Sequence, residues 1–249
     1  MVIGLIGSGN MATALARGLG EPVLCSDPVP GRASVLAGVT GGEAVETNAE
    51  VAERADLVIL CHKPAQLADV ARDIAGSAKA VVSLLASTPL SDVAAAYPGT
   101  PVFRIMPNIA AELGAGTVCW APPVGADDAL IAEVRDLLGR AGRLVDVAEA
   151  HMDIATGIVG VAPAYVALVA EAWIDAAVRR GMPLETATDL TLQSLAGGSA
   201  LLRAKDGDTL AVRRAVTSPG GVTSRGLAAL EAGGLRASFQ DALDAVLDG

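Results

Sequence analysis

Aromatic residues are nearly absent from this chain of 249 residues: they make up 2% of a sequence that is 52% hydrophobic. A core with so few rings has to be built from alanine, valine and leucine, which suits closely packed helices and a parallel sheet rich in valine and isoleucine. The chain is longer than a typical single domain and long enough for an ample core, so we expect two domains.

Basic residues are also scarce. The chain has 18 lysines and arginines against 28 acidic residues, which gives a formal net charge of −10, and its sequence pI is about 4.6. A nucleic-acid groove needs clustered lysine and arginine for its phosphate contacts, and no such basic cluster occurs here. We therefore expect no nucleic-acid partner.

The three cysteines Cys25, Cys61 and Cys119 are odd in number, widely separated and never in a Cys-x-x-Cys pair. This pattern indicates neither a disulfide framework nor a metal site, so we interpret them as core thiols. No charged segment precedes an apolar leader, because a predicted strand already occupies the start of the chain. We expect a reduced, cytoplasmic protein that does not contact a membrane.

The most informative segment is Val2–Ala12, an apolar run followed by a glycine-rich turn and the start of a helix. Gly7 permits a tight turn, Gly9 lets the backbone approach a pyrophosphate, and Ala12 keeps the helix close to the sheet. The anion would lie on the amides of the helix N-terminus. The pattern predicts a dinucleotide site, with an ordinary strand-to-helix turn as the alternative.

The first half of the chain alternates short apolar runs with helical stretches, which is typical of a parallel α/β sheet. Strands are predicted at 23–26, 57–61, 80–84 and 102–106, with a further short strand after Thr117, a helix near 127–140 and a last strand near 143–147. Cofactor and substrate would bind at the carboxyl ends of these strands. We predict an α/β fold whose Rossmann-like dinucleotide-binding domain spans 1–149.

From His151 onward the strand pattern disappears. Helices rich in alanine and leucine are predicted at about 151–181, 184–204, 207–215, 222–232 and 235–247. They carry so little polar surface that they would expose a large apolar patch, which usually marks a subunit interface. We predict that 150–249 is an all-α domain that binds substrate and forms an intertwined homodimer. A self-contained helical cap is the alternative.

Three loops place polar groups near the predicted cofactor. Lys63 follows a strand and can reach the ribose or the phosphates, or it is simply a solvated lysine. Asn108 offers a donor and an acceptor beside the nicotinamide, although a plain turn explains it as well. Gly160–Tyr165 interrupts the long helix with a glycine and a proline, and this kink would face the cleft.

The loop Thr217–Thr223 precedes an amphipathic helix and has the sharpest pattern. We expect Ser218 to cap that helix and Pro219 to enter its first turn, while Gly220 and Gly221 expose amides that can bind a carboxylate. Thr223 would present a hydroxyl beside the bound anion. An ordinary turn at a helix start is the alternative.

Taken together, these motifs resemble the pyrroline-5-carboxylate reductases. The shared elements, in order, are the opening Gly-Ser-Gly-Asn-Met-Ala, His-Lys-Pro, Arg-Ile-Met-Pro-Asn, Pro-Ala-Tyr, the helix with Glu171 and Asp175, and Val-Thr-Ser-Pro-Gly-Gly-Val-Thr at 216–223. The resemblance spans nearly the whole chain. It implies reduction of 1-pyrroline-5-carboxylate to L-proline by NADPH or NADH, in a Rossmann domain followed by a helical dimerisation domain. It also implies a homodimer or higher homo-oligomer with a site shared between subunits.

The resemblance also assigns residues. The implied cofactor-binding set is Gly7, Ser8, Gly9, Asn10, Met11, Ser26, Asp27, Lys63 and Asn108. The implied substrate-binding set is Ser218, Gly220, Gly221 and Thr223, with the hydroxyl of Thr223, the one implied catalytic residue, near the imine nitrogen. A protonated imine is already an electrophile, so holding two carbons in line would supply most of the catalysis.

The scarcity of lysine separates this reaction from alcohol oxidation. Hydroxyacid dehydrogenases with the same plan are expected to use a lysine on the long interdomain helix, and the only lysines here are Lys63, Lys79 and Lys205. Of the two histidines, His151 is interpreted as a cap or hinge residue and His62 as a weaker candidate proton carrier.

Some positions depart from the family pattern. Val161, Ala162 and Ile109 stand where hydroxyl-bearing or polar residues are usual, which would favour a less polar or alkylated cyclic imino acid. Asp27 lies 20 positions after Gly7, where a carboxylate can bond a ribose hydroxyl and repel a 2′-phosphate. Arg32 is close enough to bind that phosphate, and Asp27 can also be read as the start of an Asp-Pro turn, so the sequence favours NADH only slightly. A non-catalytic dinucleotide-binding protein is the third hypothesis.

Overall fold

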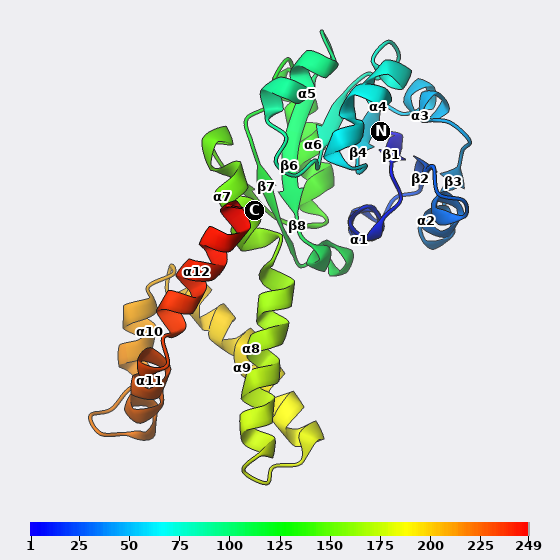
Figure 1. Ribbon diagram of the computed structural model, residues 1–249. Coiled ribbons are helices and arrows are strands. Elements are labelled where there is room, and N and C mark those ends of the chain that lie inside the picture. The colour runs from blue at the N-terminus through cyan, green and yellow to red at the C-terminus, as the bar shows by residue number, and fades with distance from the viewer. Residues whose placement is uncertain (249) are drawn as a thin grey trace. The chain divides into compact units, whose positions relative to one another are not determined.

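The computed structural model describes residues 1–248, and its contacts divide the chain into one compact unit at Met1–Pro163 and a second from Ala164 onward (Figure 1). The predicted division at 149/150 stays a prediction.

The first unit is built on one sheet of eight strands in the order β3-β2-β1-β4-β5-β6-β7-β8. The strands are β1 (Ile3–Ile6), β2 (Val23–Ser26), β3 (Glu43–Ala44), β4 (Leu57–Leu60), β5 (Val81–Ser83), β6 (Val102–Pro107), β7 (Gly116–Trp120) and β8 (Gly142–Asp146). The run β3-β2-β1-β4-β5-β6 is parallel and has the strand order of a doubly wound dinucleotide-binding fold. The predicted α/β architecture is confirmed.

Two features of the sheet differ from the sequence prediction. The two-residue strand β3 was not predicted, because its residues are exposed and carry no apolar run. In addition, β7 pairs with β6 in the antiparallel sense, with Met106 opposite Cys119. The short connection η2 (Ile109–Leu113) between these strands leaves no room for the helical crossover that parallel pairing requires.

Helices surround this sheet as α1 (Asn10–Leu19), α2 (Arg32–Thr40), α3 (Asn48–Arg54), η1 (Pro64–Gln66), α4 (Leu67–Ile74), α5 (Leu90–Ala96), α6 (Asp128–Gly139), η3 (Glu149–His151) and α7 (Met152–Val159). Strand β1 shows how they are held. Leu5 packs in one apolar cluster with Leu15 of α1 and Leu36 of α2. Its neighbour Ile6 packs in another with Val51 of α3 and Val70 of α4. Successive strand residues face opposite sides of a sheet, so an unbroken apolar strand requires helices on both faces.

The second unit contains only helices: α8 (Ala162–Val178), which begins just before the unit boundary, α9 (Leu184–Ala204), α10 (Thr209–Val216), α11 (Val222–Ala232) and α12 (Leu235–Leu247). Four of the five predicted helices are confirmed as single elements. The first, predicted as one helix over 151–181, is instead divided into α7 and α8 at Gly160 and Val161.

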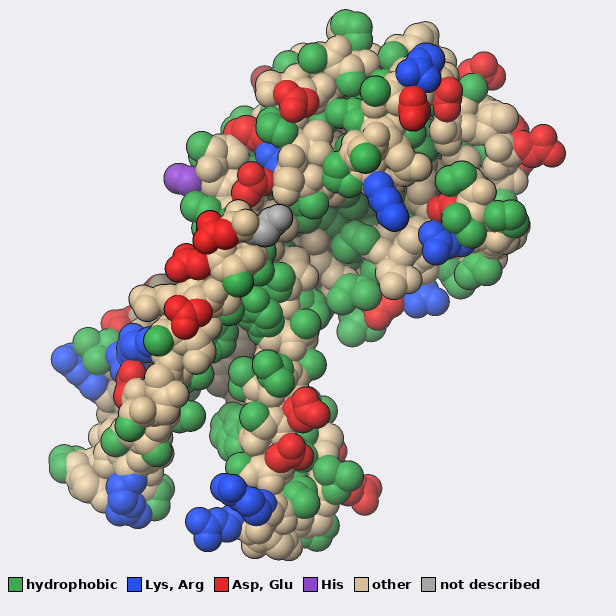
Figure 2. Space-filling view, in the orientation of Figure 1, with side chains coloured by type: hydrophobic (Ala, Val, Ile, Leu, Met, Phe, Trp, Pro, Cys, Tyr) green, Lys and Arg blue, Asp and Glu red, His purple; other side chains and the backbone are tan. Residues whose placement is uncertain are grey.

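The helical unit has almost no interior of its own. Among residues 164–248, only Ala170, Ala187 and Thr191 are buried. Large apolar side chains such as Leu168, Trp173 and Leu190 are more than half exposed, and Figure 2 shows hydrophobic groups at the surface along this part of the chain. By length and composition alone, the span Glu149–Val178, with a hydropathy of 1.7, could also cross a membrane.

Candidate functional site

The turn after β1 has a backbone that only glycine fits. Gly7 has a φ of +95°, and a Cβ there would lie 2.8 Å from the backbone of Cys61 and His62. The glycine-rich turn therefore lies directly against the loop that follows β4. A larger residue would push the two loops apart.

Gly9 has the opposite environment, because a Cβ built on it meets nothing within 4 Å. It is the N-cap residue of α1, with an extended backbone and no side-chain cap. The first amides of α1 are thus left for an anion, and the open space beside Gly9 gives a pyrophosphate room to reach them. The geometry fits a dinucleotide. Asn10 is exposed, whereas the Met11 side chain packs on the core and can offer only its backbone.

Asp27, directly after β2, ties the glycine-rich turn to the next loop. Its Oδ2 accepts the Ser8 N–H at 2.7 Å and its Oδ1 accepts the Val29 N–H at 2.8 Å. Ser26 is buried, and its hydroxyl donates to Asn48 at 2.8 Å. The Ser8 amide is consequently directed at Asp27, which holds the turn in shape.

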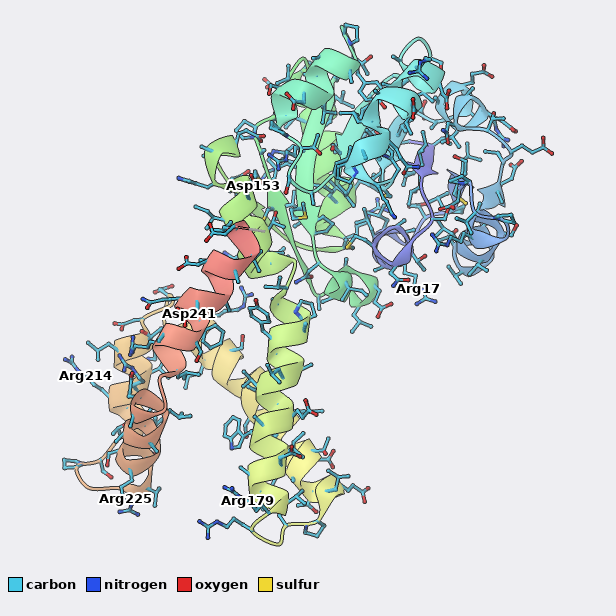
Figure 3. All side chains as sticks on the ribbon, in the orientation of Figure 1. Arg17, Asp153, Arg179, Arg214, Arg225 and Asp241 are labelled. Atoms are coloured by element: carbon cyan, nitrogen blue, oxygen red, sulfur yellow. The ribbon has the colours of Figure 1, made fainter. Side chains whose placement is uncertain are left out.

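These residues line a cleft of about 800 Å³ at the carboxyl ends of the parallel strands. Gly7, Gly9, Ser26, Asp27 and Lys63 all lie on it. A second hollow of about 760 Å³ is lined by Ser8, Gly9 and Asn10, together with Ile109 and Arg17. Figure 3 shows Arg17 on α1, where it pairs with Glu112 at 3.1 Å. Seven of the nine predicted cofactor residues therefore line one of these two hollows, and Met11 and Asn108 line neither.

Lys63 and His62 line the same cleft. Lys63 is exposed, and its backbone N–H donates to Gln66 at 3.1 Å where η1 begins. The Nδ1 of His62 lies 2.9 Å from the Lys63 carbonyl oxygen, which makes Nδ1 the protonated nitrogen. Burial lowers the pKa of His62. Burial thus favours the neutral imidazole, and its buried Nε2 has no hydrogen-bond partner within residues 1–248.

Asn108 follows β6 and is buried. Its Oδ1 accepts the Thr117 N–H at 3.3 Å and so fastens β6 to the start of β7. The amide end of its side chain keeps its donors for another partner. The strand predicted at 102–106 extends one residue further, because Pro107 is the last residue of β6 and pairs with Val118.

A buried ion cluster near this loop escaped the sequence analysis. Arg104 on β6 is 3% exposed, and it donates to Glu149 at 2.5 Å and to Asp153 at 3.1 Å. Glu149 also accepts the Leu90 N–H at 2.8 Å. The available signal was an arginine inside the apolar strand Val-Phe-Arg-Ile-Met, since a charge there needs a partner. The cluster joins β6 to the start of α7 and to α5.

The loop before α11 carries the predicted substrate residues. Gly220 has a φ of +67°, and its carbonyl oxygen accepts a 2.8 Å hydrogen bond from Arg225, which Figure 3 shows beside this loop. The helix begins at Val222 and its N-cap is Gly221, without a side-chain cap. The expectations that Ser218 caps the helix and that Pro219 enters its first turn are therefore wrong. Gly220 adds a left-handed residue, so the helix starts later than expected.

Within residues 1–248, no group of three or more His, Cys, Asp or Glu side chains could hold a metal ion. His151 does occupy the N-cap position of α7, but its side chain makes no capping hydrogen bond.

The whole chain resembles known reductases. A pyrroline-5-carboxylate reductase from Synechocystis is 33% identical over 252 residues, which cover 98% of this chain and 94% of the relative. One from Mycobacterium tuberculosis is also 33% identical, covering 98% of this chain and 93% of that protein.

The chain belongs to the pyrroline-5-carboxylate reductase family.

Solved structures and family models agree with this assignment. The family model described as pyrroline-5-carboxylate reductase dimerisation matches residues 149–248, and one described as NADP oxidoreductase coenzyme F420-dependent matches 2–87. The 1-pyrroline-5-carboxylate reductase of Streptococcus pyogenes superposes with a TM-score of 0.91 at 29% identity, covering 100% of this chain and 97% of that one. The Plasmodium falciparum pyrroline carboxylate reductase with NADP bound gives 0.89 at 26% identity, covering 100% and 96%. The predicted family, its oxidoreductase class and its use of NAD(P)H are confirmed.

Proposed function

We propose that this family member reduces 1-pyrroline-5-carboxylate to L-proline in the cytoplasm, as a step of proline biosynthesis. The observation that carries the proposal is the full-length similarity to reductases of that name, at 33% identity over 98% of the chain. A hydride adds to the imine carbon, the C=N bond becomes a single bond, and the nitrogen keeps the proton of the protonated imine. NAD(P)H supplies the hydride and leaves as NAD(P)⁺.

In the first unit, this chain's task is to bind and orient the dinucleotide. The uncapped start of α1 at Gly9 would hold the pyrophosphate, with Asn10 and Met11 in the first turn. Lys63 would lie beside the ribose or phosphates, and the free amide of Asn108 would border the nicotinamide. Fixing the cofactor in one pose contributes to the rate because hydride transfer needs two carbons held in line.

In the second unit, the loop before α11 would bind the substrate carboxylate. Gly221 leaves the first amides of α11 without a side-chain cap, and Gly220 before it has a left-handed backbone. The Ser218 side chain lies beside Gly221, since a Cβ there would be 2.3 Å from the Ser218 hydroxyl oxygen. Thr223 is half-buried in the first turn of the same helix. Its hydroxyl would then meet the imine nitrogen of a substrate whose carboxylate is held by Ser218, Gly220 and Gly221.

The active form would be an intertwined homodimer or a higher homo-oligomer. A unit of more than 80 residues in which three residues are buried cannot be stable by itself. The exposed leucines, valines and Trp173 supply the apolar surface that a second copy would cover. Burial against a second copy would also explain why the span Glu149–Val178 is so apolar, and no membrane is needed to explain it.

One observation favours a second candidate, a reductase of a less polar or alkylated cyclic imino acid. Ile109 is 45% exposed and lines the hollow beside Ser8 and Gly9. An apolar side chain at such a position gains by contact with an alkyl group and gives nothing to a polar one. Turnover of alkyl-substituted pyrroline carboxylates compared with the parent imine separates the two candidates.

The test of the proposed reaction removes one hydroxyl. Thr223→Val keeps the side-chain shape, and we expect at least a tenfold fall in kcat with unchanged cofactor affinity. Thr223→Ser retains the hydroxyl and is the matched control, expected to keep most of the rate. Equal activity of the valine variant and the wild type on every cyclic imine would refute the role of Thr223. Absence of turnover in the wild-type protein would refute the reaction itself.

A further inference from the structure

We propose that Asp27 makes this enzyme select NADH over NADPH by accepting hydrogen bonds from both hydroxyls of the adenosine ribose. The inference rests on the nucleotide site of the proposed function and names which of its two cofactors the site takes. It does not depend on which imine is reduced.

The carboxylate of Asp27 is fixed in place before any ligand binds. Oδ2 is held by the Ser8 amide at 2.7 Å and Oδ1 by the Val29 amide at 2.8 Å. These amides belong to the glycine-rich turn and to the loop after β2, so each carboxylate oxygen is held by a different loop. A group held in this way loses little conformational freedom when it binds a ligand.

The remaining hydrogen-bonding capacity of Asp27 matches an unphosphorylated ribose. An ionised carboxylate has about four acceptor sites, and the two backbone amides use two of them. One acceptor site is left on each oxygen, which suits the two neighbouring hydroxyls of a ribose. A 2′-phosphate replaces one of these donors by a group that is mostly dianionic at pH 7.5 and has only acceptors to offer.

The charges around the cleft favour the same choice. Its lining includes four carboxylates, those of Asp27, Glu46, Asp69 and Asp73, against two cations, Arg32 and Lys63. Asp27 is the carboxylate that follows β2, at the fold's usual position for recognising this ribose.

Arg32 is the group that could oppose this choice by pairing with a 2′-phosphate. It is exposed, in the first turn of α2, and lines both hollows beside the glycine-rich turn. To bind a phosphate, it would have to order a long, flexible side chain beside the fixed negative charge of Asp27. Because Asp27 is already held in place and Arg32 is not, Asp27 determines the preference for NADH.

The test is direct titration of the full-length protein with NADH and with NADPH, without any imine. We expect the wild type to bind NADH at least tenfold more tightly. Asp27→Asn should reduce the ratio of the two dissociation constants to about one. Asp128→Asn, which neutralises an exposed carboxylate in the first turn of α6 that lines neither hollow, is the matched control and should leave the ratio unchanged.

Equal or tighter binding of NADPH by the wild type would overturn the proposal. So would an equal loss of both affinities in Asp27→Asn, because Asp27 would then only hold the turn. If that variant does not fold, the wild-type ratio decides. Since these are binding constants, selective NADH binding with no imine turnover would uphold this inference while refuting the proposed reaction.

Discussion

Replacing Arg104 by methionine tests whether the buried ion cluster holds the first unit together. The variant leaves Glu149 and Asp153 without their cation. Removing one partner of a fully buried pair costs 3–5 kcal/mol, roughly the free energy of leaving the other charge unpaired. Here the carboxylates are 35% and 63% exposed, so water replaces part of the lost interaction. We expect a loss of about 2.5 kcal/mol in the free energy of unfolding.

The assay is urea unfolding followed by the fluorescence of Trp120, which is buried against Phe103 in the first unit. Trp173 is the chain's other tryptophan, so a Trp173→Phe background makes the signal specific. The double variant, Arg104→Met with Glu149→Gln, keeps an acceptor for the Leu90 N–H and removes the two charges of the Arg104–Glu149 pair, while Asp153 keeps its own. Its loss in the free energy of unfolding should be smaller, by at least ~1 kcal/mol, than the sum of the losses measured for Arg104→Met and for Glu149→Gln separately. A cost below ~1 kcal/mol for Arg104→Met, or strict additivity, would refute the reasoning.

The remaining predictions concern small residues and thiols. Gly7→Ala should cost at least ~2 kcal/mol of unfolding free energy, since its Cβ would meet backbone at 2.8 Å at a positive φ. Gly9→Ala should fold normally by circular dichroism but bind NADH at least ~10-fold more weakly; normal binding would exclude the pyrophosphate from that space. In Gly18→Ala the new Cβ would lie 2.1 Å from a carbonyl oxygen of η2, so this variant should lose about 3 kcal/mol of unfolding free energy, measured in urea. In Gly38→Ala the new Cβ lies in open space within a helix, so that variant should gain about 0.5–1 kcal/mol. Similar values for the two variants would contradict the packing argument. Desolvation raises the pKa of Cys61, which is partly exposed on the cleft, to about 12. Its thiol therefore stays protonated and should react with a disulfide reagent at pH 8 about 10³-fold more slowly than a free thiol; fast labelling would contradict the raised pKa.

The elements that the sequence predicted well are those fixed by local patterns. The apolar run of β1, the glycine-rich turn and the repeating apolar positions of α9, α11 and α12 depend on few distant contacts. The reversal of β7 could not be predicted, because its pairing depends on the length of the connection rather than on the strand itself.

The cofactor side of the candidate site was also accessible from sequence, since its residues follow strands whose carboxyl ends meet at one edge. What sequence could not supply was the direction of each polar group. Asp27 is bound by two amides, and Ser8 turns its N–H toward that carboxylate. The partnership of Arg104 and Glu149 spans 45 residues, a distance at which no periodic pattern links two positions.

The activity should depend on protein concentration, because only Ala170, Ala187 and Thr191 are buried among residues 164–248 of the helical half. If the helices become stable only when a second copy covers them, unfolding of the helical half and dissociation are one event, and the melting temperature rises with the amount of protein. Activity would then vanish on dilution before the nucleotide-binding half unfolds. A copy truncated before Ala164 lacks these helices, so it should not associate with intact copies or lower their activity. A copy altered only at the glycine-rich turn would still associate and would lower the activity of the mixed assembly.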